Sequence, residues 1–147
     1  MTQAKLNTPI FNIQNADHLS LNVMPLLHEI KHALNNLIEN NESSIIDLRS
    51  IPLANSEEDK ILEILSCGEI QAHLNALGKS EIIESQYAGV WVITHFNQDE
   101  EIISRFIEIT HIPEILCSQT LDMQDAYNHL DLILKENKPT NISSVEK

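Results

Sequence analysis

The stretch Ile70-Gln71-Ala72-His73-Leu74-Asn75 alternates apolar and polar side chains, which is the pattern of a β-strand with one buried face. Three further strand-like runs follow at about 80–87, 90–96 and 101–111, with Gly89 between the first two of them. Because the connections between these runs are short, consecutive runs are expected to pair as antiparallel neighbours. The sequence therefore predicts an antiparallel meander.

Helical patterns stand before and after the meander in the chain. Apolar residues from Met24 to Asn40 recur with the spacing of an amphipathic helix, and a second helix is predicted from about Ser56 to Ser66, with Ser56 as its cap. A short strand, Ser44-Ile45-Ile46-Asp47-Leu48-Arg49, lies between these helices. A short helix opens at Pro113, and a last amphipathic helix follows it. The positions predicted to face the core are Leu27, Ile30, Leu34, Leu37 and Ile38 in the first helix, Ile61, Leu62 and Leu65 in the second, and Met123, Ala126, Tyr127, Leu130, Ile133 and Leu134 in the last.

This order of elements predicts an α+β fold, with a mainly antiparallel sheet and amphipathic helices packed on one face. A chain of 147 residues has the size of one domain, so residues 1–147 are predicted to form a single domain with its core at about 24–136. Residues 1–21 are interpreted as an arm with a possible edge strand. Residues 137–147 are polar and without periodicity, which predicts a mobile tail.

Composition and charge exclude several classes of function. The chain carries 9 basic and 22 acidic side chains, a formal net charge of −13, so phosphate backbones and anionic membranes would repel it. No apolar stretch is long enough for a transmembrane helix, and no secretory or twin-arginine signal stands at the N-terminus, so the protein is expected in the cytoplasm. The two cysteines, Cys67 and Cys117, form no C-x-x-C pair and indicate neither a disulfide framework nor a thiolate metal site.

The sequence His28-Glu29-Ile30-Lys31-His32 satisfies the H-E-x-x-H pattern of zinc hydrolases, in which two histidines bind zinc and the glutamate polarises a water. Asn35 and Ile38 occupy the positions where metzincins have glycine and the third histidine, so the third ligand is missing. The two histidines also point away from the apolar stripe of their helix. We therefore predict no metal and no enzyme activity, and keep as the alternative a zinc-dependent hydrolase or metal-binding module that uses His28 and His32.

Three other residues have two possible roles. Cys117 follows a helix opening and is either a nucleophile or, as we expect, a small buried thiol. Trp91 is the only tryptophan, and it is either a core anchor or a partner-facing hot spot. Asp47 and Arg49 lie on the same side of their strand, which predicts a structural ion pair with charges elsewhere.

Several stretches together resemble the C-terminal domain of the hydrogenase expression/formation protein HupH, also called the HyaF type. They occur in the order of that family over roughly Met24 to Gln119. One departure is the family's Leu-Gly-x-Gly-Glu turn, which here has Ser66 in place of its first glycine. The matching stretches are Leu27-His28-Glu29-Ile30, His32-Ala33-Leu34, Ile46-Asp47-Leu48-Arg49-Ser50-Ile51-Pro52-Leu53, Gly68-Glu69, Leu77-Gly78, Gly89-Val90-Trp91, Ile107-Glu108 and Pro113-Glu114-Ile115-Leu116.

The resemblance implies an accessory protein, or chaperone, of [NiFe] hydrogenase maturation that has no catalytic activity and no cofactor. Its expected partner is an immature hydrogenase subunit, with the iron–sulfur small subunit as the usual suggestion, and other maturation proteins are further candidates. Many members of the family also have an N-terminal half with no counterpart in these 147 residues. An acidic shell suits a basic or neutral partner. The residues predicted to bind the partner are Glu84, Tyr87, Trp91, Pro113, Glu114, Ile115 and Leu116.

Overall fold

A computed structural model describes residues 22–138, and the predicted arm at 1–21 and most of the predicted tail lie outside them. The described residues form two compact units that divide between His111 and Ile112. The prediction of a single domain over the whole chain stays a prediction. The first unit contains α1 (Val23–Asn40), β1 (Ser44–Asp47), α2 (Asn55–Leu65), β2 (Gln71–Asn75), β3 (Lys79–Glu84), β4 (Val90–Phe96) and β5 (Ile102–Ile109), and the second contains η2 (Glu114–Leu116) and α3 (Thr120–Glu136).

The sheet has the order β1-β5-β4-β3-β2, and every neighbouring pair is antiparallel. The predicted α+β class and the meander of the last four strands are both confirmed. The first strand is one of the two edges, because β1 pairs with β5. The register changes once, between His95 and Phe96, where β4 meets the start of β5.

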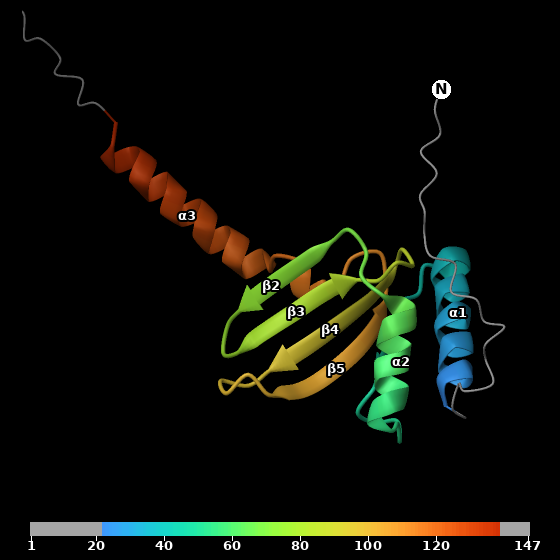
Figure 1. Ribbon diagram of the computed structural model, residues 1–147. Helices are drawn as coiled ribbons and strands as arrows, with labels where there is room; N and C mark the ends of the chain where they lie inside the picture. The colour runs from blue at the N-terminus through green and yellow to red at the C-terminus, as the bar shows by residue number, and fades with distance from the viewer. Residues whose placement is uncertain (1–21, 139–147) are drawn as a thin grey trace, which may run out of the picture. The chain divides into compact units, whose positions relative to one another are not determined.

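The main core lies between one face of the sheet and the helices α1 and α2, which pack side by side (Figure 1). The prediction that helices pack on one face is therefore confirmed for these two. The predicted stripe of α1 was wrong at Ile38, whose side chain is 71% exposed because the helix turns it away from the sheet. The fully or nearly buried core residues are Val23, Leu26, Ile30, Ala33, Leu37, Ile46, Leu48, Ile61, Ile64, Leu65, Val90, Ile107 and Ile109.

The helix α2 begins at Asn55, one residue before the predicted cap, so Ser56 lies inside the helix. Glu57 does the capping instead, because its carboxylate accepts a hydrogen bond from the backbone N–H of Ala54 at 3.0 Å. The same carboxylate accepts a bond from the side chain of Asn22, which immediately precedes α1, at 3.2 Å. Glu57 thus joins the starts of both helices and is itself buried.

The second unit holds the predicted last helix, α3, and a single turn of 3₁₀ helix, η2. The predicted apolar stripe is present on α3, but none of its residues is buried, which differs from the prediction that this stripe faces a core. No helix within residues 22–138 is long and apolar enough to cross a membrane. The large apolar side chains of α3 that are exposed are Leu121, Met123, Tyr127, Leu130, Leu132, Ile133 and Leu134.

Candidate functional site

The turn between β3 and β4 presents Tyr87 to solvent. The hydroxyl of Ser85 donates a hydrogen bond to the carbonyl oxygen of Tyr87 at 3.0 Å and accepts one from the N–H of Tyr87 at 3.1 Å. Gly89 closes the turn with a φ of +84°, a conformation that favours glycine. The Tyr87 side chain is 42% exposed, while Glu84, at the end of β3, is half-buried. The turn is therefore held by hydrogen bonds and exposes one aromatic ring.

Trp91 is a core residue, which corrects the expectation that its ring faces a partner. Its side chain is 3% exposed and clusters with Ile82 and Ile93. Its indole N–H donates to the carbonyl oxygen of Thr110 at 3.1 Å. Strand alternation places Trp91 on the opposite face of β4 from Val90, and both faces of this strand are covered. Sequence alone left these two roles open because both are common for a single tryptophan.

The predicted partner-binding residues at 113–116 belong to the second unit. Pro113 is buried, Glu114 is exposed, and Ile115 and Leu116 are each 37% exposed. Backbone hydrogen bonds from Leu116 to Pro113 and from Cys117 to Glu114 hold the turn. The Cys117 thiol is exposed, so the expectation of a buried thiol was wrong. A single surface shared by this segment and Tyr87 stays a prediction.

His28 and His32 lie on the solvent side of α1, as their helical positions predict. Together with Lys31 and Asn35 they line a shallow depression. Among residues 22–138, no three His, Cys, Asp or Glu side chains come close enough together to hold a metal ion. Two histidines four residues apart supply two of the three protein ligands that a catalytic zinc requires.

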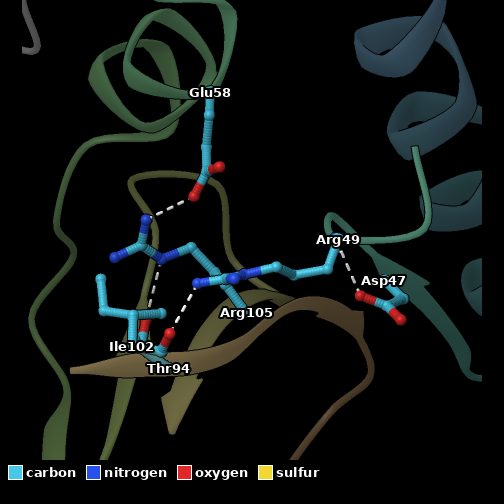
Figure 2. Close-up of polar contacts among 6 residues, drawn as sticks. All are labelled: Asp47, Arg49, Glu58, Thr94, Ile102 and Arg105. Atoms are coloured by element: carbon cyan, nitrogen blue, oxygen red, sulfur yellow. Dashed lines mark hydrogen bonds and ion pairs between the residues drawn. The ribbon is translucent and has the colours of Figure 1, made fainter. Parts of the chain in front are cut away.

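The sequence did not indicate the half-buried ion pair between Arg105 on β5 and Glu58 on α2, which Figure 2 shows. The guanidinium Nη1 of Arg105 lies 2.5 Å from the Glu58 carboxylate, and its Nε donates to the Thr94 hydroxyl at 3.1 Å. The two side chains are only 17% and 25% exposed. The available signal is the position of Arg105 two residues before Ile107, on the helix-facing side of the strand, where a charged residue requires a partner.

Asp47 and Arg49 were predicted to form ion pairs, and the structure shows a turn instead (Figure 2). The Asp47 carboxylate accepts a hydrogen bond from the backbone N–H of Arg49 at 2.9 Å. The Arg49 guanidinium donates to the carbonyl oxygen of Ile102 at 2.6 Å. The conspicuous Ile-Asp-Leu-Arg stretch therefore fixes the end of β1 against the start of β5.

A small groove of about 190 Å³ lies beside the ion pair, between the end of α2 and the strands β3, β4 and β5. Ile83 and Val92 line it with apolar side chains, and Arg105 and Cys67 also border it. The residue at its edge, Ser66, has φ 52° and ψ −165°, a conformation that strongly favours glycine. The position at which this chain departs from the Leu-Gly-x-Gly-Glu turn is thus the one whose backbone needs glycine.

Comparison with known proteins agrees with this fold. Residues 20–136 match the family described as "HupH hydrogenase expression protein, C-terminal conserved region". The solved structure of hydrogenase expression protein HupH from Thiobacillus denitrificans is 35% identical in sequence and superposes with a TM-score of 0.75, covering 80% of this chain and 98% of that one. The chain therefore belongs to the HupH family, through its C-terminal conserved region.

Two further relatives are hydrogenase expression/formation proteins. HupQ of Azotobacter chroococcum is 25% identical over 112 residues, which are 75% of this chain and 39% of the relative. HoxQ of Cupriavidus necator is 23% identical over 115 residues, which are 78% of this chain and 41% of the relative. The chain thus spans about two fifths of the length of these relatives, in which the conserved region is one part of a longer protein.

Proposed function

We propose that this protein is a non-catalytic accessory protein of [NiFe] hydrogenase maturation, which acts in the cytoplasm and binds an immature hydrogenase subunit. Membership of the HupH family is the observation that carries the proposal. The names of the relatives support a role in hydrogenase expression and formation. The iron–sulfur small subunit is the proposed client, in line with the suggestion made for the family as a whole.

Exposed apolar side chains supply the means of recognition in this proposal. Tyr87 is held on a rigid turn in the first unit, and Ile115 and Leu116 are partly exposed in the second. Exposed apolar surface of this kind is typical of sites that bind other polypeptides. In this proposal Tyr87 contacts the client from the first unit, and the 113–116 segment contributes contacts from the second. Trp91 is buried and does not touch the client.

The experiment is an affinity purification of the tagged full chain from hydrogenase-producing cells, with the bound proteins identified by mass spectrometry. Tyr87→Ala is compared with Ile38→Ala, which removes a similarly exposed apolar side chain from the outer face of α1. We expect the small-subunit precursor to be enriched with the native chain and with Ile38→Ala, and to be reduced severalfold with Tyr87→Ala. If no hydrogenase subunit is purified with the tagged chain, the proposal is contradicted. If only the large subunit is purified with it, the client is the large subunit and not the small one.

The same purified protein tests the zinc alternative through its metal content. Stoichiometric zinc that is lost in the variant His28→Ala, together with a peptidase activity lost in the same variant, would favour the hydrolase. We expect the metal content of the native chain and of His28→Ala to be equal, because the helix brings only two of the required ligands together.

A further inference from the structure

The strand β2 (Gln71–Asn75) is an edge of the sheet whose outer side has no partner strand among residues 22–138. The backbone N–H of Glu84 donates to the carbonyl oxygen of Ile70, which places that pair in a hydrogen-bonded position of the β2–β3 ladder. Such positions recur every second residue in an antiparallel pair. Ala72 and Leu74 therefore bond to β3, and the backbone groups of Gln71, His73 and Asn75 point outward.

This edge lacks the features that normally prevent two sheets from joining. Edge strands are commonly protected by lysine, proline, inward-pointing charges or a bulge. The stretch from Gln71 to Asn75 contains no lysine, no proline and no inward-pointing charge. Its pairing with β3 contains no bulge. An uncharged strand is also notable in a chain of net charge −13, because it is a place where two copies can approach with little repulsion.

Exposed apolar side chains gather at the same edge. Ile70 is 49% exposed, Leu74 is 39% exposed and Leu77, in the turn that follows β2, is 96% exposed. Strand alternation places Leu74 and Ala72 on one face, and Gln71, His73 and Asn75 on the other. The edge therefore has an apolar face and an uncharged polar face.

We propose that β2 pairs with β2 of a second copy of this chain, antiparallel and about a twofold axis at His73. In this register Gln71 lies opposite Asn75 of the partner subunit, and His73 lies opposite its own copy. The outward-pointing backbone groups of these residues then form hydrogen bonds across the interface. The two five-stranded sheets then become one continuous sheet.

The side chains of the strand complement themselves in this register. Ala72 lies opposite Leu74 of the partner subunit, so the apolar faces coincide, and the amide side chains of Gln71 and the partner's Asn75 are within reach of each other. Glu69 lies opposite Leu77 of the partner subunit, so no acidic residue meets another. A twofold interface requires such self-complementarity of one patch. A client segment requires no such match, which is why a second copy is the favoured occupant.

Sedimentation equilibrium of the full chain over a range of concentrations tests the proposal, with His73→Pro and His73→Ala as a matched pair. Proline removes the outward N–H of residue 73, which points away from β3 and pairs with no strand among residues 22–138, so the sheet is expected to keep its fold. We expect the dimer dissociation constant to rise at least about tenfold in His73→Pro, since the central backbone hydrogen bonds are lost. In His73→Ala, which keeps the N–H, it should change less than about threefold.

Circular dichroism of both variants checks that they are folded. A second measurement tests the register through disulfide formation in a Cys67→Ser, Cys117→Ser background. His73→Cys should form a disulfide-linked dimer on oxidation, because opposite hydrogen-bonded positions have suitable Cα spacing. Asn75→Cys should not, because its copy lies four residues away along the partner strand.

Several results would overturn the proposal. A native chain that stays monomeric at millimolar concentration has no such interface. A dimer that persists in folded His73→Pro but is lost in Leu130→Asp, on the exposed stripe of α3, uses a different surface. Equal loss of the dimer in His73→Pro and His73→Ala would contradict backbone pairing, and equal cross-linking at positions 73 and 75 would contradict the register.

Discussion

The burial of Trp91 makes a clear prediction at the scale of a single residue. Its side chain is 3% exposed and its indole N–H is bonded to Thr110. Trp91→Ala should therefore lower the free energy of unfolding by about 3–5 kcal/mol, through lost apolar contact and a cavity. Urea denaturation of the two proteins measures the difference.

Trp91→Phe is the control, because it keeps most of the ring and removes the N–H donor. It should cost about 1–2 kcal/mol, clearly less than the alanine variant. A Trp91→Ala protein that is as stable as the native chain but fails to capture a client would restore the partner-facing role.

Ser66 makes the second prediction, because its backbone conformation is costly for any residue with a Cβ atom. Its φ of 52° and ψ of −165° belong to a region where strain amounts to about 1–3 kcal/mol. Ser66→Gly removes this strain but gives the unfolded chain more freedom, at a cost of about 0.5–1 kcal/mol. We expect a net gain in stability of about 1 kcal/mol, measured by urea denaturation.

Ser66→Ala is the matched control, since alanine has the same Cβ and keeps the strain. The Ser66 side chain is exposed, so alanine should change stability by less than about 0.5 kcal/mol. Equal effects of glycine and alanine would show that the backbone at this position relaxes without cost.

At the scale of the elements, the ion pair between Glu58 and Arg105 joins α2 to β5. Replacing Glu58 by Gln leaves a half-buried guanidinium without its counter-charge. The expected loss is about 1–3 kcal/mol, between the values for exposed and for fully buried pairs. Thermal and urea denaturation of Glu58→Gln measure this loss.

Glu63→Gln is the control on the same helix. Glu63 is 63% exposed and pairs with Lys60 at 3.0 Å along the helix surface. Such a pair contributes little, so this variant should change stability by less than about 0.5 kcal/mol. If Glu58→Gln and Glu63→Gln lower the free energy of unfolding equally, the ion pair between Glu58 and Arg105 does not stabilise the packing of α2 on β5.

The elements also show what the sequence can predict. The alternation at 70–75 and the short connections of the meander determine local pairing, and four strands were predicted in the right order. The partner of β1 depends on a contact between Ser44 and Ile109, far apart in the chain, which no local pattern contains. Likewise, the ion pair between Glu58 and Arg105 follows only from the packing of α2 on the sheet.

For the proposed site too, local patterns in the sequence were predictive and contacts between distant parts of the chain were not. The exposure of His28 and His32 was predictable from helical periodicity, which depends only on positions within one element. The exposure of Tyr87 and the burial of Trp91 were not, because they depend on which parts of the chain cover the end of the sheet. Two aromatic residues of one hairpin, Tyr87 and Trp91, therefore differ in environment: the first is exposed and the second is buried.

At the scale of the whole molecule, the net charge of −13 leads to a prediction about binding of the proposed client. A field of one sign accelerates association with a surface of opposite charge, and salt screens that field. We expect the association rate with the small-subunit precursor to fall roughly tenfold between about 50 and 500 mM salt. Surface-based binding kinetics at several salt concentrations measure both rates.

The dissociation rate separates charge from apolar contact in the same experiment. Short-range contacts of Tyr87 are expected to govern dissociation, so Tyr87→Ala should raise the dissociation rate while leaving the salt dependence of association unchanged. An association rate that does not respond to salt would mean that the acidic surface contributes nothing to recognition. The charge would then serve to keep copies of the protein apart, and only at an uncharged stretch such as β2 would that repulsion be weak enough for two copies to meet.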